Sequence, residues 1–312
     1  MSDPATIEAA ARLLVPPGRR DEPVGPLTTY RVGGAAAILV QLDGDDDLAR
    51  LVEAVRTTGV DVLVVGRGSN LLVADAGFPG VAVVLGDAYA SVEVAGTTVR
   101  AGAAATLPVV ARRTVAAGLT GFEWAVGVPG SVGGAVRMNA GGHGADLAAS
   151  LRRVRVADLR TGEDGWVPAR HLALGYRRSS VAAHQLVLAV ELELHAGDPA
   201  AGAAAMSEIV AWRRANQPGG ANAGSVFTNP PGDSAGRLIE AAGAKGLRHG
   251  TAEVSTKHAN FIQADDGGRA DDVWALMGEV AERVEAATGV RLHPETRLVG
   301  FPPNPRLKVE GS

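Results

Sequence analysis

Three polar side chains in unusual settings are the first candidates for chemistry in this chain. Ser225 lies in the small-residue segment NAGSVFTNP, Arg177 in GYRRSS and Glu295 in LHPETRLVG. No G-x-S-x-G elbow surrounds Ser225 and no histidine base is evident nearby in the sequence, which disfavours hydrolase chemistry. Arg177 can bind a carboxylate or a phosphate at two points, although an arginine pair is also typical of a solvated surface. Glu295 could simply be a charged residue at the protein surface.

Two glycine-rich segments are suited to holding an anionic or flat ligand. Residues 66–70, GRGSN, follow a predicted strand, and their backbone N–H groups can turn inward together as an anion cradle. An ordinary tight turn gives the same pattern. Residues 128–134, VPGSVGG, permit close approach of a ligand, or form a helix start packed against a neighbour. One long diphosphate ligand explains both loops better than two coincidences, although the Rossmann fingerprint is absent.

The remaining polar clusters are less specific. Lys257-His258-Ala259-Asn260 precedes an apolar pair. The same pattern is typical of the start of a strand whose histidine is hydrogen-bonded within the protein. The seven histidines show no ligand spacing, so the sequence predicts no metal site. The absence of cysteine excludes disulfides, thiolate metal sites and cysteine nucleophiles.

Length and composition indicate a globular protein. The 312 residues are enough for two or three domains, and 46% are hydrophobic while 21% are charged. The net charge of −4 gives no general attraction to nucleic acid or to an anionic membrane. The first residues do not resemble a signal peptide, and no apolar run approaches the ~20 residues that span a bilayer. We therefore expect a soluble, cytoplasmic protein with no nucleic-acid or membrane partner.

Hydrophobic periodicity predicts the elements that must position these segments. Three parts are expected: 1–85, alternating strand and helix; 86–197, richer in strands; and 198–312, with a long amphipathic helix. The tail PPNPRLKVEGS is expected to be frayed. Predicted helices are 45–58 (capped by Asp45 or Asp46), 107–117, 206–215, 235–242 and 271–288. Predicted strands are 36–42, 61–65, 81–85, 91–95, 97–101, 151–157, 186–194 and 296–299.

Eight segments in order resemble the UDP-N-acetylenolpyruvoylglucosamine reductase family, flavoenzymes that complete UDP-N-acetylmuramate in peptidoglycan synthesis. The similarity runs from Thr29 to Gly300. The segments are TTYRVGGAA, VVGRGSNLLVADAGFPG, GFEWAVGVPGSVGGAVRMNAGG, GYRRSS, NAGSVFTNP, AGRLIEAAGAKG, VSTKHANFI and LHPETRLVG. The resemblance implies a part in cell-wall biogenesis, and through it in cell shape, cell cycle and cell division.

The resemblance also implies a fold and a cofactor. The fold would be α+β: a two-subdomain FAD-binding fold of the vanillyl-alcohol-oxidase (PCMH) type, with a C-terminal α+β substrate domain. FAD would be held non-covalently, and NADPH would reduce it and leave before the enolpyruvyl sugar nucleotide enters the same cleft. The cofactor-binding residues would be Gly66, Arg67, Gly68, Ser69, Asn70, Leu71, Val128, Pro129, Gly130, Ser131, Gly133, Gly134 and Asn139.

By the family match, three side chains carry the second half of the reaction. Hydride addition to the terminal enol-ether carbon builds negative charge on the neighbouring carbon and its carboxylate, which must be stabilised where it appears. Arg177 and Glu295 would do this at the carboxylate; Glu295 would need a proton, which a buried carboxyl can retain. Ser225 would then protonate the carbon. Substrate-binding residues would be Tyr176, Asn229, Arg213, Arg214, Arg248, Lys257 and Asn260.

Three departures from the family pattern affect substrate binding rather than this catalytic set. His143 stands where tyrosine is frequent, Asn216 where lysine is common, and Thr228 where the serine loop often has lysine. The sequence GFEW…PGSVGGA resembles that of the family subtype that lacks the extra tyrosine-bearing loop over the substrate. Two alternatives stay open: a flavin-binding protein without this activity, and an oxidase of the same fold acting on a sugar or an alcohol.

Overall fold

The chain forms two compact units in a computed structural model that describes residues 1–307. Unit 1 comprises Met1–Asp21, Ala37–Arg67 and Pro79–Arg213, whereas unit 2 comprises Glu22–Ala36, Gly68–Phe78 and the chain from Arg214 onward. Two short N-terminal segments therefore pack with the C-terminal third of the chain. The three-part division at residues 85 and 197 stays a prediction.

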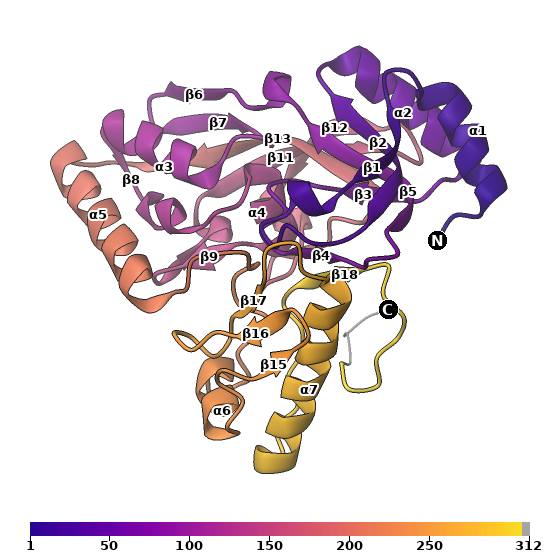
Figure 1. Ribbon diagram of the computed structural model, residues 1–312. Helices are drawn as coiled ribbons and strands as arrows, with labels where there is room; N and C mark the ends of the chain where they lie inside the picture. Colours follow the sequence, from indigo (N-terminus) through magenta and orange to yellow (C-terminus); the bar gives the residue numbers. More distant parts are fainter. Residues whose placement is uncertain (308–312) are drawn as a thin grey trace. The chain divides into compact units, whose positions relative to one another are not determined.

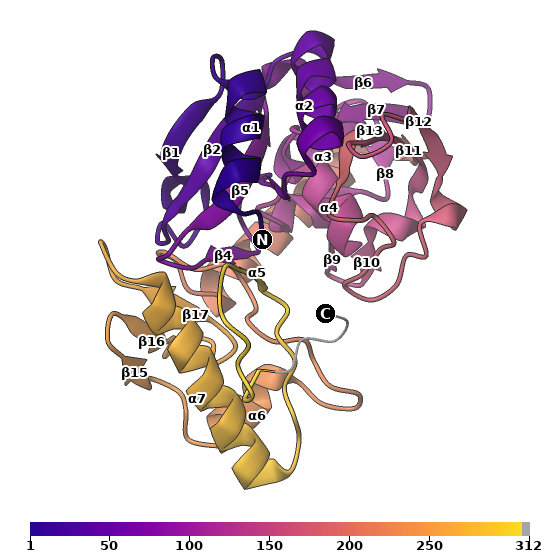
Figure 2. The ribbon, with the colours of Figure 1, turned by 90° about the vertical axis from the view of Figure 1, so that its right-hand side faces the viewer.

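The first sheet of unit 1 has the strand order β1-β2-β5-β3 and is covered by two helices. In Figure 2, α1 and α2 lie side by side on this sheet. Leu48, Leu51 and Val55 of α2 are buried in the core that forms there, as the helical spacing predicted. The elements are α1 (Pro4–Leu14), β1 (Arg19–Pro23), β2 (Ala35–Leu42), α2 (Asp45–Thr58), β3 (Val62–Val64) and β5 (Phe78–Leu85).

The second sheet of unit 1 is antiparallel, with the order β12-β11-β13-β7-β6. Helix α4 packs on β13 and β7, and α3 shares the same core (Figure 1). The elements are β6 (Val92–Ala95), β7 (Thr98–Gly102), α3 (Leu107–Ala116), β8 (Leu119–Thr120), α4 (Val132–Met138), β9 (Gly141–Gly142), β10 (Ala145–Asp146), β11 (Leu151–Asp158), β12 (Asp164–Pro168), β13 (Gln185–Glu193), β14 (His195–Ala196) and α5 (Pro199–Asn216).

Unit 2 is built around its longest helix. Figure 1 shows α7 beside the three-stranded sheet β15-β16-β17, and Val273, Leu276 and Met277 are fully buried in the core between them. Strands β4 and β18 pair in parallel. The elements are β4 (Leu71–Val73), α6 (Ala235–Ala241), β15 (Arg248–His249), β16 (Ala252–Val254), β17 (Ile262–Ala264), α7 (Ala270–Thr288) and β18 (Arg297–Val299).

Three sequence expectations about helices and the tail are wrong. Neither Asp45 nor Asp46 caps α2. The N-cap position is occupied by Gly44, which has no side chain to accept a hydrogen bond. Helix α5 begins at Pro199 rather than at residue 206, since its first turns are alanine-rich and bury only Gly202, which leaves no apolar stripe to detect. Leu307 is buried in the core of unit 2, so the tail is not frayed up to that residue; residues 308–312 lie outside the described part.

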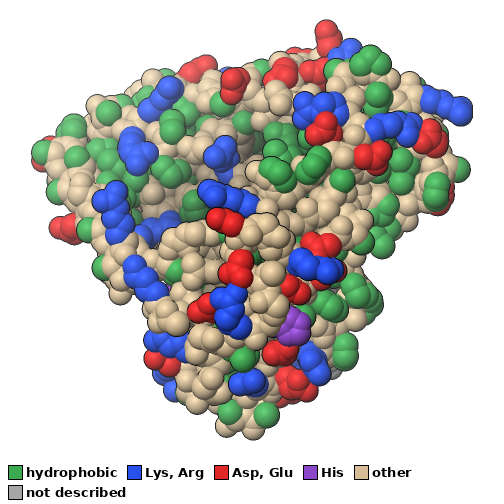
Figure 3. Space-filling view, viewed as in Figure 1, with side chains coloured by type: hydrophobic (Ala, Val, Ile, Leu, Met, Phe, Trp, Pro, Cys, Tyr) green, Lys and Arg blue, Asp and Glu red, His purple; other side chains and the backbone are tan. Residues whose placement is uncertain are grey.

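The surface shows no strong segregation of charge in the view of Figure 3, where basic and acidic side chains are interspersed over much of the face. None of the helices in residues 1–307 is both long and apolar enough to cross a membrane.

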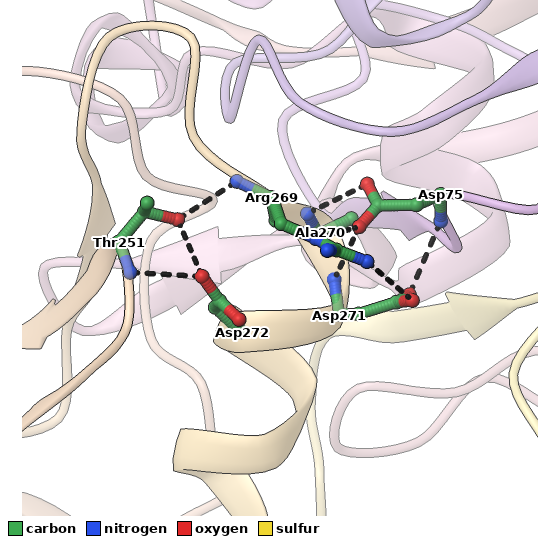
Figure 4. A network of polar contacts seen from close by, with 6 residues as sticks. All are labelled: Asp75, Thr251, Arg269, Ala270, Asp271 and Asp272. Atoms are coloured by element: carbon green, nitrogen blue, oxygen red, sulfur yellow. Dashed lines mark hydrogen bonds and ion pairs between the residues drawn. The ribbon is translucent and has the colours of Figure 1, made fainter.

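Helix α7 is capped by a residue nearly two hundred positions away (Figure 4). Its own N-cap residue, Arg269, makes no side-chain cap bond. The carboxylate of Asp75 instead accepts hydrogen bonds from the backbone N–H of Ala270 at 2.9 Å and of Asp271 at 3.3 Å. Asp271 accepts in return from the Asp75 N–H at 3.2 Å. This reciprocal cap ties the segment 68–78 to α7 within unit 2.

We expect Asp75→Ala to lower the free energy of unfolding by about 1–2 kcal/mol, because the first N–H groups of α7 lose their acceptor. Urea denaturation monitored by circular dichroism measures the change. Asp266→Ala, which removes an exposed loop carboxylate, is the matched control and should shift the midpoint little. Equal losses in the two variants would contradict a cap at Asp75.

Candidate active site

The two predicted glycine loops meet within unit 1. A Cβ added to Gly66 would lie 2.5 Å from the Ser131 hydroxyl, so a side chain at that position would force this hydroxyl to move. Ser131 is the N-cap of α4 and accepts from the Gly134 N–H at 3.4 Å. The second loop is therefore a helix start packed against a neighbour, and close approach of a ligand to it stays a prediction.

The first loop retains the donors that an anion needs. Among residues 1–307, the backbone N–H groups of residues 66–69 have no hydrogen-bond acceptor. Gly68 has φ +58°, and a Cβ there would lie 2.4 Å from the Leu27 carbonyl oxygen, so only glycine fits. The second loop offers less, because Val132 and Gly133 already donate to Ala105 and Ala103. This donor set fits a diphosphate on the first loop, as expected for FAD.

The serine loop is held on both sides of Ser225, which is itself partly exposed. Before it, the side-chain oxygen of Asn222 accepts from the Gly224 N–H at 3.0 Å, and Gly224 has φ +75°. After it, the Asn260 amide is bonded to both backbone groups of Phe227, accepting at 3.0 Å and donating at 2.8 Å. Asn260 is 3% exposed, so these bonds form away from water.

Glu295 is joined to the serine loop and to the first glycine loop. Its backbone N–H donates to the Val226 carbonyl at 2.8 Å, one residue after Ser225. Its carbonyl accepts from the Asn70 side chain at 3.0 Å, and the Asn70 carbonyl accepts from the Arg297 N–H at 3.1 Å. Three predicted site residues, Asn70, Ser225 and Glu295, thus come together within unit 2.

Arg177 lies in unit 1 at the tip of a tight hairpin, so its meeting with Ser225 and Glu295 stays a prediction. Its backbone has φ +54°, which is rare for a residue other than glycine. Its guanidinium donates to the Gly141 carbonyl at 3.1 Å and lies 5.3 Å from the ring centre of Tyr176, which is 61% exposed. Asn139, at the end of α4, directs its amide to protein groups; a flavin contact there stays a prediction.

Several of the predicted substrate-binding side chains already bond other groups of the protein. Arg248 is already paired with Glu253 and Asp265, and the Asn229 side chain accepts from the Ala235 N–H at the start of α6. Lys257 donates to the carbonyl of Arg214.

Arg213 differs from that group because it has no acceptor among the described residues. It is half-buried, and burial lowers the pKa of its guanidinium. Trp212 beside it meets His143 edge-on at 5.2 Å between ring centres. Arg213 is therefore a better candidate for binding an anionic ligand than Arg248 or Lys257, which already bond protein groups.

Sequence reasoning missed the residues that hold these loops. Asn222, Asp75 and Arg137, which donates to the Ser179 carbonyl at 3.4 Å, carried no catalytic signal. The bonds of Asn260 to the Phe227 backbone were not foreseen either. Only Asn222 had a readable cue, since Asn followed two residues later by Gly is typical of an Asx turn. The other contacts join residues that are 33 or more positions apart in the chain.

Two family profiles match the chain. The profile described as "UDP-N-acetylenolpyruvoylglucosamine reductase, C-terminal domain" matches residues 216–299, and the profile described as "FAD binding domain" matches residues 36–164. The first covers Ser225 and Glu295. The second covers both glycine loops, so the fit of the first loop to a diphosphate agrees with an independent finding.

Whole-chain relatives have the same description. UDP-N-acetylenolpyruvoylglucosamine reductases from Rubrobacter xylanophilus and Acidiphilium cryptum are 42% and 43% identical, over 93% and 90% of this chain and 97% and 91% of theirs. The crystal structure of the Thermus caldophilus enzyme (MurB) superposes with a TM-score of 0.79 at 34% identity, covering 90% of this chain and 99% of that one. The expected fold class and the FAD cofactor are confirmed. The chain belongs to the UDP-N-acetylenolpyruvoylglucosamine reductase family.

Proposed function

We propose that this protein reduces UDP-N-acetylglucosamine enolpyruvate to UDP-N-acetylmuramate with NADPH as the electron donor. FAD, when bound, would supply the redox chemistry, namely hydride transfer from NADPH to the terminal carbon of the enol ether. The backbone N–H groups of residues 66–69, with Ser69 and Asn70, would hold its diphosphate. The remaining steps concern what the side chains of this chain do to the substrate.

Ser225 is the proposed proton donor. Hydride addition leaves an electron pair on the carbon next to the carboxylate, and a proton delivered to that carbon completes the reduction of the double bond. Serine is a weak acid, so the transfer depends on a strongly basic enolate and on a hydroxyl held in advance. The bonds of Asn222 and Asn260 on either side of Ser225 supply that restraint.

Arg177 and Glu295 are the proposed stabilisers of the enolate. The guanidinium of Arg177 can donate two hydrogen bonds to the substrate carboxylate as its charge grows. Glu295 in its protonated form can donate one more. The observation that carries the proposal is the link from Ser225 to Glu295 through the Val226 carbonyl, which keeps proton donor and carboxyl on adjoining backbone.

The cytoplasm is the proposed compartment, since both NADPH and a nucleotide sugar are made and used there. Arg213 is the preferred residue for the substrate diphosphate among the basic candidates, because the others are exposed or already bonded within the protein.

An anaerobic half-reaction tests the function. The flavin of the purified protein is reduced with one equivalent of NADPH, and the enolpyruvyl substrate is then added while absorbance near 450 nm is followed. We expect the oxidised flavin spectrum to return with one product molecule per flavin. A flavin that stays reduced refutes the proposal and favours the alternative of a flavin-binding protein without this activity. In a separate sample the reduced protein is exposed to oxygen, and rapid reoxidation with release of peroxide would support the oxidase.

A further inference from the structure

The hairpin that carries Arg177, residues 175–179, is bound at both of its ends by the end of α4. Gly175 and Arg178 exchange two backbone hydrogen bonds of 3.1 and 3.2 Å, which leaves Tyr176 and Arg177 at the tip. The Asn139 amide donates to the Gly175 carbonyl at 3.1 Å. At the other end Arg137 donates to the Ser179 carbonyl at 3.4 Å. Two residues of one short segment therefore bind both sides of the hairpin.

Each contact is reinforced. The hydroxyl of Ser179 donates back to the Arg137 carbonyl at 2.9 Å, so that pair is bonded in both directions. Asn139 donates a second time to the Asp146 carboxylate at 3.1 Å and accepts from the Ala148 N–H at 3.0 Å. Its side chain thus uses both donors and one acceptor site on the protein. Because Asn139 is 2% exposed, water cannot replace these bonds if they are lost.

The restraint coincides with backbone strain at the residue it serves. Arg177 has φ +54°, which costs a non-glycine residue on the order of 1 kcal/mol or more and persists only where surrounding contacts require it. Asn139 also has a positive φ, of 38°, which turns the chain sharply after α4. Two residues later the Gly141 carbonyl accepts from the Arg177 guanidinium at 3.1 Å. The same segment therefore holds the backbone and the side chain of Arg177.

We propose that Asn139 and Arg137 are positioning residues for Arg177, acting through the two ends of its hairpin and not on the flavin. The inference rests on the proposed function, in which Arg177 binds the substrate carboxylate. Placement matters there, because the developing charge is stabilised only by donors aimed at it in advance, and an error of about 1 Å can reduce the rate about 10²-fold.

Two variants remove the contacts; Asn139→Gly also removes the bonds to Asp146 and Ala148, whereas Arg137→Met leaves those bonds intact. Asn139→Gly deletes the amide and tolerates the positive φ, while Arg137→Met deletes the guanidinium and keeps an apolar chain of similar length. Thr114→Val is the matched control: it removes a buried hydroxyl that donates to the Ala111 carbonyl at 2.9 Å, in the same unit and away from the hairpin. Stopped-flow absorbance measures both half-reactions of each flavin-loaded protein.

We expect Asn139→Gly and Arg137→Met to slow flavin reoxidation by the enolpyruvyl substrate about 10- to 100-fold. Flavin reduction by NADPH and the flavin spectrum should stay close to those of the unaltered protein, as should both half-reactions of Thr114→Val. Amide hydrogen exchange should rise at residues 175–179 in the two variants. A variant that slows both half-reactions together, or that loses its flavin, overturns the inference, because the residue then serves the cofactor or the whole fold.

Combination with Arg177→Ala separates this inference from the proposed function. If Asn139 acts only through Arg177, the double variant Asn139→Gly/Arg177→Ala should be no slower than Arg177→Ala alone. Multiplying losses would overturn the positioning role while leaving Arg177 in place. If Arg177→Ala slows reoxidation and neither positioning variant does, the inference fails and the proposed function stands. If Arg177→Ala itself changes nothing, the proposed role of Arg177 fails.

Discussion

Ser225→Ala should slow the transfer from reduced flavin to the enolpyruvyl substrate by about 10²-fold or more, because the enolate loses its positioned proton donor. Reduction of the flavin by NADPH should be unchanged, since that step requires no proton on the substrate carbon. The loop itself should persist, because the Asn222 and Asn260 bonds do not involve the Ser225 side chain. Anaerobic stopped-flow absorbance measures the two half-reactions separately.

Ser207→Ala is a suitable control for this experiment. It makes the same chemical change on the exposed face of α5, where the hydroxyl only donates to the Ala203 carbonyl at 2.9 Å. Its two half-reactions should match those of the unaltered protein. Reoxidation of Ser225→Ala at the rate of the unaltered protein would remove Ser225 from the mechanism. Solvent would then be the proton source.

Asn260→Leu should destabilise the protein more than any other single change considered, by about 2–6 kcal/mol. The substitution leaves the N–H and the C=O of Phe227 without partners, and Phe227 is 1% exposed. Each unsatisfied buried group costs about 1–3 kcal/mol. Urea denaturation of the purified variant measures the loss, and the serine loop should become more open to proteolysis.

Gln263→Leu is the matched comparison for Asn260→Leu. Gln263 also donates an amide hydrogen bond to the backbone near the serine loop, to Gly219 at 2.8 Å, but on the surface, where water replaces it. Its loss should change stability by about 0.5 kcal/mol or less. A similar small value for Asn260→Leu would show that the Phe227 backbone groups find other partners and that Asn260 does not anchor the loop.

Local sequence patterns predicted the helices whose apolar residues recur with the helical period. In α7 the stripe that includes Val273, Leu276 and Met277 is buried, and Gly289 ends the helix with φ +72°. The prediction failed where that signal is missing, as in the first turns of α5, whose run of small residues buries only Gly202. Local patterns made no prediction of the N-terminal cap of α7, because the cap comes from Asp75, far away in the chain.

The candidate site shows the same division. Residue types and their order were enough to nominate Ser225, Arg177 and Glu295, because each lies in a segment with its own composition. They did not reveal that the side chains of Asn260 and Asn139 bond the protein backbone, and the predicted contacts of these residues with substrate and flavin stay predictions. In the structure both side chains bond backbone of the loops that hold Ser225 and Arg177. An amide in a sequence looks the same whether its partner is a ligand or a carbonyl.

The amino-acid sequence by itself determined the family, the FAD cofactor and the three residues proposed for catalysis, since these depend on residue identity along short segments. Only the tertiary structure decided how those segments are held: Glu295 between Val226 and Asn70, and the hairpin of Arg177 by Asn139 and Arg137. The physical reason is that a hydrogen bond joins atoms that are close in space, and its partners can lie anywhere in the chain. Short sequence segments indicate which residues can react, whereas the positions of those residues relative to one another are established only by folding.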